Sequence, residues 1–280
     1  MNIVFDIGGT KMRVAAARGD ELGEVQIAPT PHEPGDGIAQ LQELARAVAA
    51  ESGIEAVAGC IAGSVNEKGE IFDARNLQEW EGVNIVDELS DAFGVRVPVV
   101  HDAAAAGLGE AHVGAGKGAS VLVYVTVSTG VGGARIVNGK IDAAGGIGHT
   151  NVGESDLESL VSGTAVTRKF GIHPKDLESL EERNKLADLL AEGLAVLVEK
   201  WSPDTIVLGG SMIVGVNPIP LARTAESLAK RLTMHPKPPI IKMAQLGDNG
   251  GLHGAAILAQ EILPALPDRQ AGGQAGLSTE

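Results

Sequence analysis

The feature that most constrains this sequence is a pattern of strand, glycine-rich turn and strand that occurs twice. Strand-like composition covers residues 2–5, 13–17, 121–127 and 134–137. The first pair of strands flanks the turn Ile7-Gly8-Gly9-Thr10-Lys11, and the second pair flanks Ser128-Thr129-Gly130-Val131-Gly132-Gly133. Two homologous halves, each offering a glycine turn to a shared cleft, would explain the pattern. Two unrelated hairpins are the alternative.

The rest of the chain alternates between helical and strand-like segments. Apolar residues recur at helical spacing from Ile38 to Val48, from Leu186 to Val198, and again over residues 252–263. Short runs typical of buried strands cover residues 57–61, 97–100 and 205–208. This alternation predicts an α/β protein with mostly parallel sheets that carry antiparallel hairpins.

The composition limits the kinds of ligand and partner that this chain can have. Aromatic residues make up only 2% of the 280 residues, so a ligand site should be polar rather than an aromatic box. The net charge of −14 disfavours nucleic acid and anionic membrane surfaces as partners. The single cysteine excludes an internal disulfide and a multi-cysteine zinc site. With no signal-peptide pattern and no membrane-length apolar run, we expect a cytoplasmic protein. The Gly-, Gln- and Ser-rich tail at 267–280 is expected to be disordered.

The first glycine turn has the composition of a phosphate-binding site. Gly8 and Gly9 let the backbone approach a phosphate closely, and successive amides form an anion-binding nest. Thr10 adds a hydroxyl and Lys11 a positive charge. Asp6 fits beside a phosphate only if magnesium lies between them. A hairpin turn capped by an aspartate is the alternative.

Two later glycine breaks fit the same interpretation. The turn that contains Thr129 and Gly130 offers a second nest with hydroxyl groups. Gly209 and Gly210 form a third break, directly after a strand-like run. Each could be only a turn. Together they indicate a phosphate cleft shared between two halves.

His101 and Asp102 lie where a buried strand ends and an alanine-rich helix begins. The carboxyl ends of parallel strands are where α/β proteins place ligands. Asp102 is therefore a candidate general base, which would accept the proton of an attacking hydroxyl. In the alternative interpretation, Asp102 is only the N-cap of the following helix.

Three further segments could face a ligand. His149 follows a glycine-rich loop and could reach a ligand pocket, although such a histidine is more often structural. Glu158 begins a helical pattern and could instead be a solvated helical carboxylate. Asn76 together with Trp80 could form a polar and stacking surface, or a loop anchored by a buried tryptophan.

Taken in order, these motifs resemble the ROK family of sugar kinases and repressors, a branch of the actin-like ATPase superfamily. Residues 6–11 match its first phosphate motif and residues 127–133 resemble the second. Residues 207–210 resemble the adenosine-side motif, residues 76–80 the Asn-Leu-x-x-Trp segment, and residues 247–255 the C-terminal connecting segment. The resemblance extends from residue 2 to about residue 263.

The resemblance implies a duplicated, ribonuclease H-like fold with two domains around a nucleotide and sugar cleft. It implies ATP and magnesium as cofactors and a hexose phosphorylated at its 6-OH, with Asp102 as the catalytic base. The expected sugar contacts are Asn76, His101, Asp102, His149 and Glu158. The expected nucleotide contacts are Asp6, Gly8, Gly9, Thr10, Lys11, Thr129, Gly130, Gly209 and Gly210, with Asp6 holding magnesium through water.

The sequence departs from the family pattern at three places. The zinc-binding cysteine cluster is absent, and its loop is shortened to residues 150–157, so we expect no zinc. The usual glutamate three residues before His149 is Gly146, and the usual asparagine before the base is His101. Losing both suggests a different sugar, weaker binding or a degenerate site.

The expected small domain covers residues 1–102, closed by a C-terminal helix at about 252–265, and the large domain covers 103–250. A homodimer is possible, as is common in such relatives. Family repressors place a basic DNA-binding domain ahead of the first phosphate motif, which begins here at residue 6, so we expect a kinase. A catalytically degenerate or regulatory sugar- and nucleotide-binding protein is the alternative.

Overall fold

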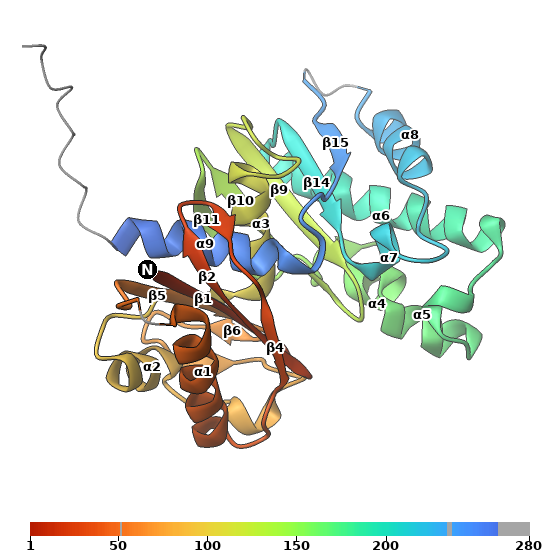
Figure 1. Cartoon of the computed structure of the whole chain (residues 1–280). Coiled ribbons are helices and arrows are strands. Elements are labelled where there is room, and N and C mark those ends of the chain that lie inside the picture. Colours follow the sequence, from red (N-terminus) through yellow and green to blue (C-terminus); the bar gives the residue numbers. More distant parts are fainter. Residues whose placement is uncertain (51, 234–236, 263–280) are drawn as a thin grey trace, which may run out of the picture.

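The computed structural model describes residues 1–50, 52–233 and 237–262, which form two lobes (Figure 1). The elements of the N-terminal lobe and the helix that leaves it are β1 (Asn2–Ile7), β2 (Lys11–Arg18), β3 (Glu21–Leu22), β4 (Gln26–Pro29), α1 (Pro34–Ala49), β5 (Ala56–Ile61), β6 (Ser64–Val65), β7 (Ile71–Phe72), the 3-10 helix η1 (Gln78–Trp80), α2 (Ile85–Phe93), β8 (Val99–His101) and α3 (Asp102–His112).

The second lobe follows in the sequence. Its elements are β9 (Val121–Val127), β10 (Val131–Val137), β11 (Lys140–Ala144), β12 (Asn151–Val152), β13 (Ser155–Asp156), α4 (Leu157–Val161), α5 (Gly163–Phe170), η2 (Pro174–Asp176), α6 (Leu180–Trp201), β14 (Thr205–Gly209), α7 (Ser211–Val214), α8 (Leu221–Arg231), β15 (Ile240–Met243), η3 (Gly247–Asn249) and the last described helix, α9 (Gly250–Ile262).

The two main sheets have the same topology. The first has the order β3-β2-β1-β5-β8, with β4 also pairing with β2, and the second has the order β11-β10-β9-β14-β15. In each sheet an antiparallel hairpin (β1–β2 or β9–β10) is extended by two parallel strands. The duplication predicted from the two glycine turns is confirmed at the level of strand order.

Each lobe has its own apolar core, built mostly from aliphatic residues as the composition requires. In the first lobe, α1 packs over the sheet through Leu41 and Ala45, which face Ile3 and Phe5 in one cluster. The glycines of the sheet matter for this packing, because a Cβ on Gly59 would overlap the ring of Phe5. In the second lobe, α6 covers the sheet with the face predicted from its apolar spacing.

Helices α3 and α9 join the lobes. Helix α3 follows the last strand of the first sheet and packs on β9 and β10 of the second, whereas α9 follows the last strand of the second sheet and packs on β1 and β5 of the first. The two helices also pack against each other between the sheets (Figure 1). Gly109 permits a close approach, since a Cβ there would lie 2.7 Å from the carbonyl oxygen of Gly250.

The structure shifts some predicted boundaries. The strand expected at 97–100 is observed at Val99–His101, because Pro98 lacks the N–H that a strand position requires. The last helix begins at Gly250 rather than Leu252. The predicted tail at 267–280 and the end of the closing helix lie outside the described residues.

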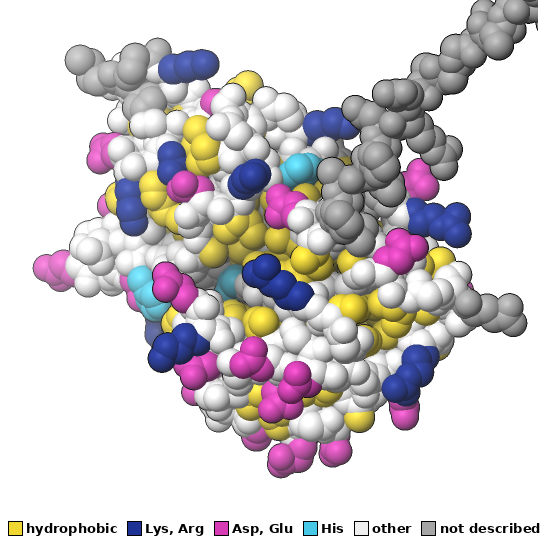
Figure 2. All heavy atoms as spheres, turned by 90° about the vertical axis from the view of Figure 1, so that its left-hand side faces the viewer, with side chains coloured by type: hydrophobic (Ala, Val, Ile, Leu, Met, Phe, Trp, Pro, Cys, Tyr) yellow, Lys and Arg dark blue, Asp and Glu magenta, His cyan; other side chains and the backbone are white. Residues whose placement is uncertain are grey.

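Two surface features complete the fold. In the described part of the chain, none of the helices combines the length and apolarity that crossing a bilayer would require. Figure 2 shows acidic side chains gathered at the lower end of one face, over the lobe built on the first sheet. This distribution agrees with the net charge of −14.

Candidate active site between the two lobes

The first glycine turn is the tight connection between β1 and β2. The N–H of Gly8 donates to the carbonyl of Lys11 at 3.0 Å, and the Thr30 hydroxyl donates to the carbonyl of Gly8 at 2.6 Å. Thr10 and Lys11 are exposed at the tip. The turn is thus fixed by backbone hydrogen bonds while its hydroxyl and ammonium groups are free to meet a ligand.

The second and third glycine breaks meet in the other lobe. The N–H of Ser211 donates to the Ser128 hydroxyl at 3.0 Å. Gly210 has a φ of 87°, and a Cβ on it would lie 2.7 Å from the Thr126 hydroxyl and overlap the carbonyl of Val127. Only glycine fits there. Two turns separated by about 80 residues in sequence are therefore in direct contact within the second lobe.

Asp6 is the most perturbed acid of the cleft. Its pKa is raised from 3.8 to about 6, mainly by burial and then by the charge of Asp102, while Arg13 and the Cys60 thiol oppose the shift. Arg13 lies 3.3 Å from the carboxylate, and Cys60 donates to it at 3.6 Å. The β1–β2 register sets Asp6 opposite Arg13, and the parallel β1–β5 register sets it beside Cys60.

Asp102 is the first residue of α3, at the carboxyl end of β8. Its side chain is 43% exposed, and one oxygen accepts the N–H of Ala103 at 2.6 Å. The N-cap of the helix is His101, whose Nδ1 accepts the same N–H at 3.1 Å. The interpretation of Asp102 as the N-cap is therefore wrong by one residue, because the backbone becomes helical at Asp102 itself.

Glu158 is held against the second glycine turn. Its Oε2 accepts the N–H of Val131 at 2.9 Å, and Cβ atoms on Gly130 and Gly148 would lie 2.7 Å and 3.3 Å from the glutamate side chain. Arg75, from the other lobe, donates to Oε1 at 2.5 Å. Sequence reasoning missed Arg75. The one available signal was its position directly before Asn76.

Asn76 lies at the first glycine turn, and Trp80 does not face the cleft. A Cβ on Gly9 would lie 2.5 Å from that of Asn76, so the asparagine packs directly on the turn. Trp80 is fully buried, and its indole N–H donates to the carbonyl of Pro31 at 3.2 Å. The stacking-surface interpretation of Trp80 is wrong, and the buried-anchor alternative is correct.

The loop that carries His149 holds that side chain beside an acidic residue. His149 lies 3.5 Å from Asp156, the N-cap of α4, and is more than half exposed. Gly145 and Gly146 both have positive φ, at 77° and 70°. A side chain at Gly146 would meet open space but a strained backbone. The position of the missing glutamate thus has a backbone conformation that favours glycine.

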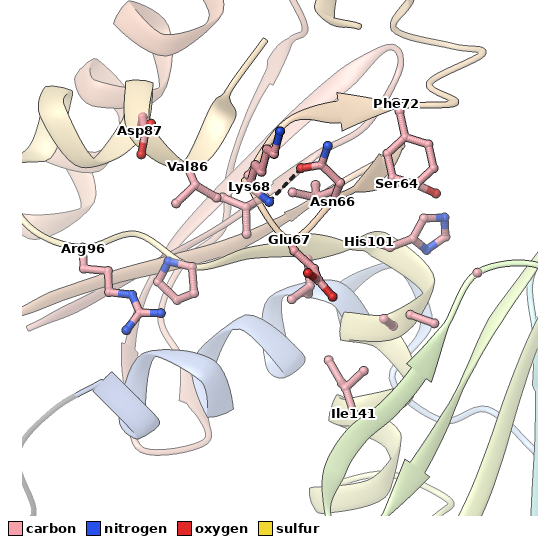
Figure 3. A pocket seen from close by; sticks show the side chains of 18 residues that line it. Ser64, Asn66, Glu67, Lys68, Phe72, Val86, Asp87, Arg96, His101 and Ile141 are labelled. Atoms are coloured by element: carbon pink, nitrogen blue, oxygen red, sulfur yellow. Dashed lines mark hydrogen bonds between the residues drawn. The ribbon is translucent and has the colours of Figure 1, made fainter. Parts of the chain in front are cut away.

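A pocket of about 550 Å³ opens beside His101 (Figure 3). It is bounded by the β6–β7 hairpin, the end of β8 and the β11 strand. Phe72, half exposed, and Ser64 lie on the same side as the His101 ring in this view. His101 therefore borders both this pocket and the cleft, where Gly132 of β10 faces its ring.

Two acidic side chains of the site could contribute oxygen ligands to a metal ion. Asp6 and Asp102 offer carboxylate oxygens within electrostatic reach of each other, and such hard ligands suit magnesium. In the described ranges, no group of three or more His, Cys, Asp or Glu side chains is arranged to hold a metal ion. The absence of zinc stays a prediction, to be checked by elemental analysis.

Several proteins that resemble this chain are sugar kinases by name. A glucokinase from Streptomyces coelicolor is 28% identical over 324 residues, covering 95% of this chain and 99% of the glucokinase. A fructokinase from Zymomonas mobilis is 31% identical over 205 residues, covering 64% of this chain and 67% of the fructokinase. The crystal structure of the ROK hexokinase from Thermus thermophilus matches with a TM-score of 0.81 at 27% identity, covering 92% and 97% of the two chains.

The duplicated sheets and the glycine turns facing one cleft define an actin-like ATPase fold. Residues 2–262 match the ROK family. The chain belongs to the ROK family, as its motifs predicted.

Proposed function

We propose that this chain phosphorylates the 6-OH of a hexose, with Asp102 as the general base. The coarser function, ATP-dependent phosphorylation of a sugar, is that of the kinases in its family. The observation that carries the finer proposal is the position of Asp102. It lies at the carboxyl end of β8, partly exposed, close enough to Asp6 to raise that residue's pKa.

The reaction needs one proton transfer and one exchange of bonds at phosphorus. Asp102 accepts the proton of the sugar hydroxyl as its oxygen forms a bond to the γ-phosphorus. The bond from that phosphorus to the β,γ-bridging oxygen breaks, and ADP leaves. Phosphoryl transfer depends mainly on positioning and charge neutralisation, which a carboxylate base and two glycine turns can supply.

We propose nucleotide contacts on both lobes. Gly8, Gly9, Thr10 and Lys11 would hold phosphates from one lobe, and Thr129 with Gly130 from the other. Gly209 and Gly210 would lie on the adenosine side. Magnesium, when bound, would neutralise phosphate charge, and we propose that Asp6 would hold it through water.

The sugar contacts we propose are Asn76, His101, Asp102, His149 and Glu158. Asn76 and Glu158 are supported by their contacts with the two glycine turns. His149 has weaker support, since it pairs with Asp156 instead.

A coupled assay of ADP release tests the proposal, with magnesium-ATP and a panel of glucose, mannose, fructose, N-acetylglucosamine and N-acetylmannosamine. We expect sugar-dependent ADP release on at least one hexose, and the product phosphorylated at O6 by NMR. Phosphorylation at another hydroxyl would refute the 6-OH assignment. Nucleotide binding without turnover on any sugar would favour the degenerate or regulatory alternative, which the loss of the usual residues at His101 and Gly146 motivates.

Further proposals concern the domain boundaries, the location and the oligomeric state of the protein. We propose a small domain at 1–102 closed by α9, a large domain at 103–250, a cytoplasmic location and a homodimer. The packing of α9 on β1 and β5 supports the first. Light scattering on the purified chain tests the dimer, and a mass of one chain would exclude it.

A further inference from the structure

A continuous series of contacts connects the two glycine turns through the proposed sugar site. In the first lobe, Asn76 packs so closely on Gly9 that a Cβ there would lie 2.9 Å from the Asn76 carbonyl oxygen. In the second lobe, Glu158 accepts the N–H of Val131 at 2.9 Å and lies against Gly130. In each lobe, one proposed sugar-binding residue thus contacts one of the proposed phosphate-binding turns.

Arg75 closes the gap between these two halves. It is bonded in sequence to Asn76, and its Nη1 donates to the Oε1 of Glu158 at 2.5 Å. Its Nε lies 3.5 Å from Asp73, a neighbour in its own lobe. A planar guanidinium can hold two carboxylates at once in this way, which a single ammonium group does less well. The Arg75–Glu158 ion pair therefore connects the two lobes.

Because the Arg75–Glu158 ion pair reaches solvent, breaking it costs little free energy. The side chains of Arg75 and Glu158 are 59% and 22% exposed. Ion pairs that reach solvent contribute little to stability and are weakened by salt. When the open and closed states of a contact differ little in free energy, a ligand that binds one state more tightly shifts the equilibrium toward that state.

We propose that the Arg75–Glu158 ion pair couples sugar binding to nucleotide binding. The inference rests on the proposed function and makes Arg75 a positioning residue. A sugar that bonds to Asn76 and to the unused lone pairs of Glu158 favours the closed pair. The closed pair in turn holds the two phosphate turns at the separation where one nucleotide contacts both. By thermodynamic linkage, nucleotide then tightens sugar binding by the same factor.

Calorimetric titration with the non-hydrolysable analogue AMPPNP and magnesium tests this, with and without the hexose that turns over fastest in the panel. The variants are Arg75→Gln, which is shorter and uncharged, and Arg75→Lys, which keeps the charge but lacks the planar guanidinium with its several N–H donors. Arg46→Gln is the matched control, because Arg46 is exposed on α1 of the same lobe. Melting temperatures of all variants confirm that each is folded.

In the wild type and in Arg46→Gln, we expect the sugar to lower the Kd for AMPPNP by about fivefold or more, the usual scale of coupling between sites. In Arg75→Gln the sugar should change the Kd for AMPPNP by no more than about twofold. In Arg75→Lys the effect of the sugar should lie between that of Arg75→Gln and that of the wild type. The coupling of the wild type should also weaken as salt is raised.

Two results would overturn the coupling proposal alone. One is undiminished coupling in Arg75→Gln; if its sugar Kd alone rises, Arg75 is a sugar contact and not a link. The other is a wild type that binds both ligands independently. Failure of the wild type to bind AMPPNP at all is a distinct outcome, which overturns the proposed function and the coupling with it.

Discussion

Gly254 of α9 contacts the backbone of Ala105 in α3 so closely that a Cβ on the glycine would overlap the Ala105 carbonyl oxygen. Each of these helices follows the last strand of one sheet and packs on the other sheet. Their crossing is therefore the joint between the lobes. Glycine is required at this joint because no side chain separates the two backbones.

Gly254→Ala should lower the free energy of unfolding by about 2 kcal/mol, since overfilling a packed site forces the backbone to move. Urea denaturation measures this change. The control is Gly35→Ala on α1, where a Cβ meets no heavy atom within 4 Å. That variant should be unchanged or up to about 1 kcal/mol more stable. A Gly254→Ala protein as stable as the wild type would mean that the helices do not approach this closely.

The raised pKa of Asp6 predicts how stability depends on pH in the absence of ligands. The unfolded chain releases the Asp6 proton near 3.8 and the folded chain near 6. Between these values the folded state binds more protons, so this residue makes the free energy of unfolding fall as pH rises from about 4 to about 6.

Asp6→Asn should remove this dependence while keeping a hydrogen-bond acceptor for Arg13. Above pH 6 we expect the variant to exceed the wild type in stability by on the order of 2 kcal/mol, and the difference should vanish toward pH 4. Denaturation curves at several pH values measure both limits. A variant less stable than the wild type at high pH would show that the Arg13 ion pair outweighs burial.

His101→Asn tests the departure from the family pattern next to the base. His101 caps α3 through the Ala103 N–H, and asparagine is at least as good a cap, so stability should stay within about 1 kcal/mol. An amide beside the sugar should change the relative kcat/KM values across the hexose panel by about tenfold for at least one sugar. Unchanged relative values would place His101 outside the sugar site. Gly146→Glu is a poorer probe, because the φ of 70° strains any side chain.

The local pattern of the sequence predicts the parts of the fold that depend on period and turn chemistry. The two glycine turns, their flanking strands and the duplicated sheet follow from alternation and glycine spacing. The contact between Asp6 and Arg13 can also be predicted from the sequence, because a hairpin centred on residues 9 and 10 sets positions 6 and 13 opposite each other.

The parts that could not be predicted depend on contacts between distant segments. Arg75 and Glu158 are 83 residues apart, and no local pattern relates them. Glu110 is similar: it is buried in α3 and its carboxylate accepts backbone N–H groups of Ala115, Gln245 and Leu246. The sequence also leaves open whether Trp80 is a ligand surface or a buried anchor, because burial depends on the whole fold. Here α1 buries the ring, and Gly37 makes room for it.

Asp102→Asn tests the central claim most directly. Asparagine can still accept the Ala103 N–H, so the melting temperature should barely change, whereas it cannot take a proton from a sugar hydroxyl. The control is Asp36→Asn, which removes the same charge from the first turn of α1, in the helix that covers the first sheet. On the best hexose of the panel, we expect kcat to fall about a hundredfold or more in Asp102→Asn and to stay unchanged in Asp36→Asn. The Kd for AMPPNP should change little. Near-normal kcat in a folded Asp102→Asn protein would contradict the mechanism.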